Sequence, residues 1–255
     1  MGTAPRPSRR LEGRIALVTG ASRGIGRAVA LRFAAEGAHV VAVARTQGAL
    51  EELDDEIRAL GGEATLVPCD LVDHEAIDRL GAAIHERWGR LDILVGNAGL
   101  LGILSPLGHI DPKEWDKVFA VNVTANWRLI RSLDLLLKAS DAGRVVFLSS
   151  GAGHRAELRA YWGLYGVTKA ALDALARFYA AETQNISSVR VNLFNPGPLR
   201  TTMRAKAMPG EDPMTLKTPE EAAPQIVAMC SPAWTETGKL YDFPQGRVLS
   251  FREPG

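Results

Sequence analysis

The sequence predicts a single α/β domain built as a doubly wound parallel β-sheet with helices on both faces. Short aliphatic runs alternate with longer amphipathic segments along the whole chain, and this order requires parallel pairing through right-handed crossovers. A glycine-rich turn follows the first aliphatic run, as expected where a strand leads into a helix. The 255 residues, of which 46% are hydrophobic, suit one large domain with a sizeable core.

The individual elements follow from periodicity and from capping residues. Aliphatic runs predict strands at 14–19, 39–44, 64–69, 91–95, 144–148, 189–194 and 239–243. Amphipathic segments predict helices at 27–36, 46–60, 73–88, 111–138, 161–184 and 220–230. The longest of these helices is expected to begin after Asp111 as its N-cap, with Pro112 in the first helical position.

The domain organisation is simple, since the sequence contains no internal boundary or repeat. We expect residues 13–255 to form one domain and residues 1–12, which are basic and contain prolines, to form a flexible tail. The long irregular segment 196–219 is interpreted as a lid over a substrate. A disordered crossover with no role in binding is the alternative.

Charge and cysteine content argue against several classes of function. A net charge of +1 gives no field that favours nucleic acid or an anionic membrane. No apolar run approaches the roughly 20 residues of a membrane span. Cys69 and Cys230 lie far apart without metal-ligand spacing, so we expect buried thiols, no metal site and a reducing, cytoplasmic location.

The glycine-rich turn after the first strand is typical of a dinucleotide-binding site in a Rossmann-like fold. Gly20 permits a tight turn, while Gly24 and Gly26 let backbone amides and the next helix N-terminus approach a pyrophosphate. The same predicted phosphate loop also contains Ser22, Arg23 and Ile25.

The end of the second strand indicates which dinucleotide binds. NAD-dependent sites place a carboxylate there, about twenty residues beyond the glycines, to bind the ribose 2′-hydroxyl. This chain has Arg45 instead. Arg45 and Arg23 are placed to clamp a 2′-phosphate, because guanidinium groups suit phosphate oxygens. We therefore predict NADP(H) in preference to NAD(H), with two solvated arginines as the alternative.

A second group of polar residues predicts acid–base chemistry. Ser150 follows the fifth strand, and Tyr165 and Lys169 lie one turn apart on one face of the next helix. A phenol has a pKa of about 10. An adjacent ammonium and the cationic oxidised nicotinamide both favour the phenolate and lower that pKa. We prefer Ser150 to Ser149 because successive strand residues point to opposite faces. His154 is a candidate for substrate contact, with simple exposure as the alternative.

Together these motifs resemble those of the short-chain dehydrogenase/reductase family, in family order over about residues 13–201. TGASRGIG matches the cofactor loop, and Ser150, Tyr165 and Lys169 match the catalytic serine and the Tyr-x-x-x-Lys pair. The remaining matches are Asn97-Ala98-Gly99, Asn122 within VNV, and Pro196-Gly197 followed by Thr201. Shorter stretches such as NAGLLG and RTTMRAKAMPGEDP resemble a bacterial oxidoreductase subfamily within that family.

The resemblance implies reversible hydride transfer between NADP(H) and a carbonyl or alcohol. Tyr165 would exchange the proton, Ser150 would bind the substrate oxygen, and Asn122 would hold a water in a relay behind Lys169. The other implied contacts to the cofactor run along the carboxyl ends of the strands. They are Asp70, Leu71, Asn97, Ala98, Gly99, Tyr165, Lys169, Pro196, Gly197, Leu199 and Thr201. Capping of the following segment is an alternative role for Asp70.

Two departures from the family pattern affect substrate and assembly. Ser150 and Tyr165 are fifteen residues apart, about two more than is common, and the C-terminus lacks the usual Asp-Gly-Gly. We expect a homodimer or homotetramer that acts on a small-molecule carbonyl or alcohol. One alternative is a 3-oxoacyl-thioester reductase, for which Arg155, Arg159 and Arg200 hint at a basic entrance. Another is a catalytically silent dinucleotide-binding sensor.

Overall fold

The computed structural model describes residues 9–154 and 158–251, and within these ranges every predicted strand is present. The strands are β1 (Ile15–Thr19), β2 (His39–Ala44), β3 (Glu63–Pro68), β4 (Ile93–Gly96), β5 (Arg144–Leu148), β6 (Arg190–Asn195), β7 (Lys239–Asp242) and β8 (Arg247–Ser250). The α-helices are α1 (Gly24–Ala35), α2 (Gln47–Ala59), α3 (His74–Trp88), α4 (Pro112–Phe119), α5 (Ala125–Lys138), α6 (Gly151–His154), α7 (Gly163–Thr183), α8 (Thr202–Ala207) and α9 (Pro219–Cys230). Shorter turns are η1 (Leu107–His109), η2 (Ala120–Thr124) and η3 (Pro213–Thr215).

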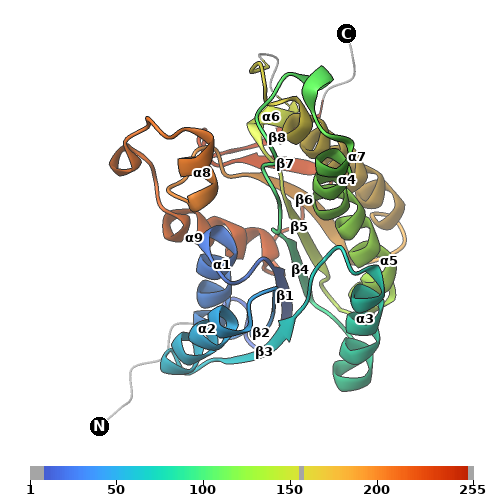
Figure 1. The fold of residues 1–255 in the computed structure, drawn as a ribbon. Coiled ribbons are helices and arrows are strands. Elements are labelled where there is room, and N and C mark those ends of the chain that lie inside the picture. Colours follow the sequence, from blue (N-terminus) through green and yellow to red (C-terminus); the bar gives the residue numbers. More distant parts are fainter. Residues whose placement is uncertain (1–8, 155–157, 252–255) are drawn as a thin grey trace.

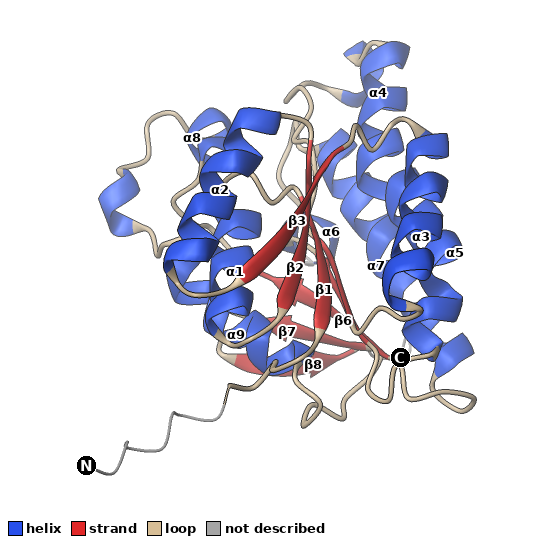
Figure 2. Ribbon diagram, turned by 90° about the horizontal axis from the view of Figure 1, so that it is seen from below, coloured by secondary structure: helices blue, strands red, loops and turns tan. Residues whose placement is uncertain are grey.

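The strands form one sheet in the order β3-β2-β1-β4-β5-β6-β7-β8, which confirms the predicted doubly wound α/β class (Figure 1). Strands β1 to β7 pair in parallel, and β8 pairs antiparallel with β7. Helices α1, α2 and α9 cover one face, and α3, α5 and α7 cover the other (Figure 2). Because both faces are covered, β1 and β5 are buried along their whole length, which explains their continuous apolar sequence.

The direction in which successive strands are added to the sheet changes between β1 and β4. Strands β2 and β3 are added outward on one side of β1, and strands β4 to β8 on the other. Ligands bind outside the carboxyl ends of the strands at such a switch point. The glycine turn after β1 and the Asn97 turn after β4 both lie there, so the sheet topology itself positions the predicted site.

Several local features differ from the predicted elements. The predicted helix 111–138 is divided into α4 and α5 by η2, which is one turn of π-helix. Helix α7 begins at Gly163 and not at Tyr161, because Tyr161 has a left-handed backbone with φ of 70°. The sequence did not predict α6, α8, η1, η3 or β8.

The predicted N-terminal tail ends earlier than expected. Leu11 is fully buried in the hydrophobic core, and Arg10 pairs with Glu36, so residues 9–12 belong to the folded domain. The rest of the predicted tail, residues 1–8, lies outside the described residues. The segment 196–219 contains α8, η3 and a parallel bridge between Leu199 and Lys217, so it is more regular than predicted.

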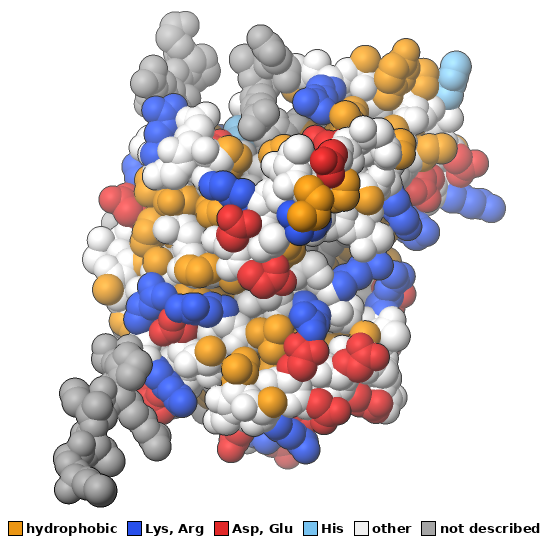
Figure 3. Space-filling view, turned by 90° about the vertical axis from the view of Figure 1, so that its left-hand side faces the viewer, with side chains coloured by type: hydrophobic (Ala, Val, Ile, Leu, Met, Phe, Trp, Pro, Cys, Tyr) orange, Lys and Arg blue, Asp and Glu red, His pale blue; other side chains and the backbone are white. Residues whose placement is uncertain are grey.

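The surface carries both signs of charge. Basic and acidic side chains are interspersed over the face shown in Figure 3. None of the helices in the part of the chain that the structure describes has the length and apolar content needed to cross a membrane.

Candidate active site

The glycine turn leaves the N-terminus of α1 open for an anion. Arg23 occupies the N-cap position without a side-chain capping bond, and the first turn of α1 contains no acidic residue. Gly20 and Gly24 have φ values of 64° and 54°. A Cβ atom on Gly26 would lie 2.3 Å from the Gly20 carbonyl oxygen, so only glycine allows this close approach. Free amides at a helix N-terminus fit the pyrophosphate of a dinucleotide.

Thr19 and Asn97 hold the turns after β1 and β4 together. The buried Thr19 hydroxyl accepts hydrogen bonds from the backbone amides of Asn97 and Ala98, each at 3.0 Å. The Asn97 amide group donates to the carbonyl oxygens of Thr19 and Gly20, at 2.8 and 3.3 Å. Asn97 therefore braces the glycine turn, and both bonds come from its side-chain amide nitrogen.

The segment after β6 approaches the same turn from the other side. A Cβ on Gly24 would lie 3.6 Å from the Thr201 methyl group, which places Thr201 over the glycine turn. The Thr201 hydroxyl accepts the Arg204 amide and so caps α8. Leu199 is buried next to it. Gly197, which follows Pro196, has φ of 64°, and a Cβ there would lie 2.3 Å from Pro244.

Arg23 and Arg45 are exposed at the carboxyl ends of neighbouring strands. Arg45 directly follows β2, and Arg23 belongs to the turn after β1, with which β2 pairs. No ion pair joins either guanidinium to another of the residues that the structure describes. Asp70, after β3, is exposed, and its carboxylate accepts the Val72 amide at 3.2 Å, as the capping alternative predicts. Leu71 is buried beside it.

The acid–base residues lie on the buried face of α7. Tyr165 and Lys169 are 8% and 4% exposed. The Lys169 ammonium donates to the Leu148 carbonyl at 2.6 Å and lies 5.7 Å from the centre of the Tyr165 ring. The two serines after β5 diverge, because Ser149 donates to Asp173 at 2.5 Å while the Ser150 hydroxyl lies within hydrogen-bonding reach of Tyr165.

Burial favours the neutral form of both groups. It raises the pKa of Tyr165 to about 12, although the Ser150 hydrogen bond opposes the rise. It also lowers the pKa of Lys169 to about 8. The predicted lowering of the Tyr165 pKa, which includes the charge of the oxidised nicotinamide, is not seen in the protein by itself. The physical reason is that desolvation of the phenol exceeds every favourable contact that this site provides.

Asn122 is completely buried in the π-helical turn η2. Its side chain accepts the Leu100 amide at 2.7 Å and donates to the Leu100 carbonyl and to the Thr168 hydroxyl, both at 2.9 Å. A Cβ on Gly99 would lie 3.4 Å from Asn122 Oδ1 and 3.7 Å from Lys169 Nζ. The turn after β4 thus meets the acid–base residues at Gly99. Helical turns of this kind are frequent at functional sites.

His154 occupies neither of its predicted environments. Its side chain is only 14% exposed, and Nδ1 lies 3.6 Å from the carboxylate of Asp173. The chain folds this way because α6 packs closely on α7: a Cβ on Gly153 would lie 2.7 Å from the Ala170 nitrogen. Sequence reasoning also missed Thr168 and Asp173. Asp173 could have been found from its spacing, because Tyr165, Lys169 and Asp173 follow one another at four-residue intervals and so share one helix face.

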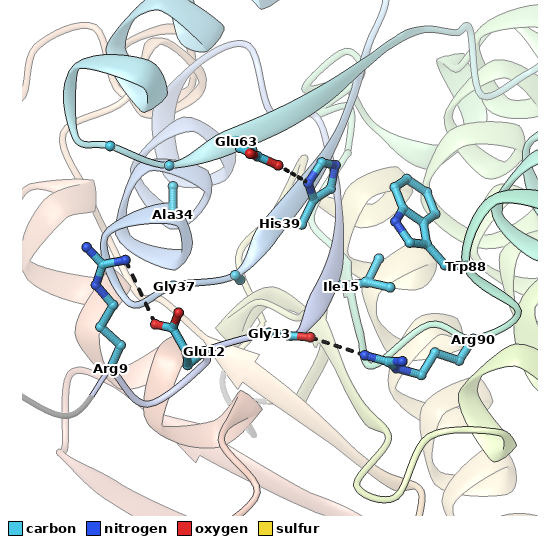
Figure 4. Close-up of a pocket in the computed structure, with 13 residues that line it drawn as sticks. Arg9, Glu12, Gly13, Ile15, Ala34, Gly37, His39, Glu63, Trp88 and Arg90 are labelled. Carbon is cyan, nitrogen blue, oxygen red and sulfur yellow. Dashed lines mark hydrogen bonds and ion pairs between the residues drawn. The ribbon is translucent and has the colours of Figure 1, made fainter.

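A separate hollow of about 420 Å³ lies at the amino ends of the strands, opposite the glycine turn (Figure 4). Its charged side chains are engaged with one another: Arg9 pairs with Glu12, and His39 lies 3.5 Å from Glu63. Arg90 donates to the Gly13 carbonyl. Because these polar groups already have partners, we place the candidate site at the carboxyl edge of the sheet.

The doubly wound sheet and the open glycine turn at its switch point are features of the dinucleotide-binding class of folds, and comparison with known proteins identifies the family. The family model for short chain dehydrogenases matches residues 14–212, so the chain belongs to the short-chain dehydrogenase family. The chain is 39% identical to the oxidoreductase YciK of Escherichia coli over 241 residues, which cover 93% of this chain and 94% of that protein. The resemblance to a bacterial oxidoreductase subfamily is thereby confirmed.

Two further relatives differ in the cofactor that their descriptions name. A crystal structure of a short chain dehydrogenase from Escherichia coli, complexed with NADPH, is 38% identical with a TM-score of 0.86, and covers 93% of this chain and 99% of that chain. An oxidoreductase of Mycobacterium tuberculosis described as NAD-dependent is 37% identical over 207 residues, or 76% of this chain and 74% of that protein.

The brace between β1 and β4 can be tested by replacing Thr19 with valine, which preserves its shape. We expect Thr19→Val to lower the free energy of unfolding by about 2 kcal/mol, because the amides of Asn97 and Ala98 lose their acceptor inside the protein. Urea denaturation measures this loss. The control is Thr46→Val, since Thr46 is exposed and makes no side-chain capping bond. Equal stability of the two variants would contradict the brace.

Proposed function

We propose that this protein transfers a hydride reversibly between NADP(H) and the carbon of a carbonyl or alcohol substrate. The observation that carries the proposal is the burial of Tyr165 and Lys169 on one face of α7, with the Ser150 hydroxyl beside the phenol. This group adjoins the glycine turn through Gly99. A proton donor and an anion-binding loop thus share one edge of the sheet.

Each residue has a role that follows from its chemistry. A bound nicotinamide cofactor supplies or accepts the hydride. Tyr165 donates a proton to the substrate oxygen during reduction and accepts it during oxidation. Ser150 donates a hydrogen bond to the same oxygen and stabilises the charge that develops there. Lys169 holds positive charge next to the phenol, and Asn122 orders the backbone at Leu100 and a water-mediated path behind Lys169.

The preference for NADP(H) rests on Arg45 and Arg23. Both are exposed at the place where a 2′-phosphate would lie, and no carboxylate occupies the end of β2. The NADPH complex of the Escherichia coli relative supports the same choice, while the Mycobacterium tuberculosis relative is described as NAD-dependent. Arginine beside the ribose favours the extra phosphate through charge-assisted hydrogen bonds. The remaining predicted contacts, among them Asp70 and Leu71, are proposed to line the adenine.

Residues 196–219 are proposed to close over the substrate. Thr201 lies over the glycine turn, so bound cofactor would contact the start of α8 directly. At the far end of α8, Met208 contacts Arg159, which belongs to the loop in front of α7. The segment therefore spans the cofactor side and the loop that follows Ser150, as a lid requires.

The two alternative functions have less support. A thioester reductase requires free basic residues at the entrance, but Arg200 donates to the carbonyls of Pro213 and Leu216 and so holds the lid segment together. Arg159 lies over Trp162, and Arg155 falls outside the described residues. A silent sensor has no need of a lysine buried beside a tyrosine, which desolvation makes costly.

We also propose that the chain forms a homodimer or homotetramer in a cytoplasmic setting, where its two free, buried cysteines stay reduced. Large apolar side chains are exposed on the outer sides of α5 and α7: Leu135 is 80% and Phe178 70% exposed. The hydrogen bond from Tyr179 to Asp134 shows that these helices lie side by side. Sedimentation of the purified protein should give two or four copies, and a monomer at micromolar concentration would refute this proposal.

The proposed reaction is tested by following NADPH oxidation with a panel of aldehydes, ketones, quinones and acyl thioesters. At least one carbonyl should be reduced, and Tyr165→Phe should lower kcat roughly 100-fold or more, because the proton donor is removed. NADPH affinity should change little in that variant. Tyr241→Phe, a change outside the site, is the matched control. Full activity in Tyr165→Phe would refute the assigned role.

Cofactor preference is tested at the end of β2. Replacement of Arg45 with aspartate should move the ratio of kcat/KM for NADPH and NADH toward NADH by roughly tenfold or more, since a charge-assisted bond to the 2′-phosphate is lost. Arg247→Asp, on the edge strand β8, should leave the ratio unchanged. A wild-type protein that prefers NADH would overturn the NADP(H) proposal.

A further inference from the structure

Asp173 is a buried carboxylate that the proposed reaction does not use. It is 4% exposed and lies one turn beyond Lys169, which itself lies one turn beyond Tyr165. The three side chains therefore share one buried face of α7. A carboxylate is rarely buried without a functional or structural partner, so its surroundings are informative.

Two elements meet the carboxylate of Asp173. Ser149, at the end of β5, donates its hydroxyl hydrogen to Oδ1 at 2.5 Å. His154, at the end of α6, places Nδ1 3.6 Å from Oδ2. Neither ring nitrogen of His154, nor Oδ2 of Asp173, has a hydrogen-bond partner among the described residues. The carboxylate is thus anchored at one oxygen, while its other oxygen faces an imidazole that can supply one proton.

Asp173 also acts on both members of the acid–base pair. Its negative charge favours the protonated forms of Lys169 and Tyr165, and so opposes the lowering of the Lys169 pKa by burial. Lys169 forms no ion pair with any described carboxylate, and its hydrogen bond to the Leu148 carbonyl is to a neutral group. Asp173 is therefore the anion that most directly compensates the buried ammonium.

We propose that Asp173 is a positioning residue for the hydride-transfer site: fixed by Ser149 and faced by His154, its carboxylate keeps Lys169 cationic beside Tyr165. The proposal rests on the function proposed above for that pair, but its structural basis is independent of the substrate. His154 closes the second side of this site, because its Nδ1 lies 3.6 Å from Oδ2 of Asp173. His154, a candidate for substrate contact with simple exposure as the alternative, thus lies against Asp173 instead.

The charged groups on the neighbouring elements that the structure describes make no recorded contact with Asp173. From α7, Arg177 extends over Phe251. From β7, Asp242 binds the Asn195 side chain. On α4, the charged residues Lys113, Asp116 and Lys117 are exposed to solvent, and Glu114 is half-buried without a recorded contact to Asp173. On β6, Arg190 binds carbonyls at the amino end of the strand. The titratable groups that face Asp173 are therefore Tyr165, Lys169 and His154.

The proposal is tested without cofactor by NMR of protein labelled with ¹³C-lysine, in which the Lys169 resonance is identified with Lys169→Arg. The wild-type ammonium should titrate with a pKa of about 8. Asp173→Asn keeps an acceptor for Ser149 but removes the charge, and should lower this midpoint by roughly one pH unit. Ser149→Ala keeps the charge, and should leave the midpoint unchanged while lowering the melting temperature. Equal midpoints in wild type and Asp173→Asn would overturn the proposal.

A second variant decides the matter if Asp173→Asn does not fold. His154→Lys places a fixed cation next to Asp173 and should lower the Lys169 midpoint in the same direction, whereas an unchanged midpoint would count against the proposal. In kinetics, the pH profile of alcohol oxidation by Asp173→Asn should move to lower pH with little change in KM. If the wild type turns over no substrate, the proposed function fails, while the NMR midpoints still decide the role of Asp173.

Discussion

The structure depends on the hydrogen bonds that the Thr19 hydroxyl makes between β1 and β4. These bonds lie where the strand order changes direction. There, β1 and β4 lie side by side, but their chains leave in different directions. Backbone amides exposed by this divergence need acceptors, and Thr19 provides one for two of them. Asn97 completes the network by donating to the glycine turn. Without this network, neither the anion-binding turn nor Gly99 would be fixed relative to α7.

Burial shifts the pKa values of both members of the proposed acid–base pair. A phenol and an ammonium removed from water both favour their neutral forms, so Tyr165 resists ionisation and Lys169 loses its proton more easily. A proton exchanger that serves both directions of a redox reaction must hold these tendencies in balance. The protein provides one anion, Asp173, and one hydroxyl, Ser150, that act on the Tyr165 pKa in opposite directions.

The sheet and the main motifs could be predicted from sequence because they are encoded in neighbouring residues. Parallel order follows from alternating elements, and the glycines and the Tyr165–Lys169 spacing are local patterns. The turn at Asn122 could not be predicted, since the π-helical geometry accompanies bonds to Leu100, a residue distant in sequence. The inward orientation of His154 likewise depends on the close packing of α6 on α7, and no local pattern records such a contact.

The connection between Ser150 and Tyr165 is held at both of its ends, so Ser150 and Tyr165 keep their positions. Its first part, α6, is fixed to α7 by the close approach of Gly153, so Ser150 keeps its position. Its last part is fixed where the Tyr161 carbonyl accepts the Ser105 amide, in a left-handed conformation that few residues other than glycine adopt. Between these two anchors, Leu158 and Tyr161 are exposed. The residues between these anchors can therefore differ in sequence, and so contact different substrates, without moving Tyr165 or Lys169.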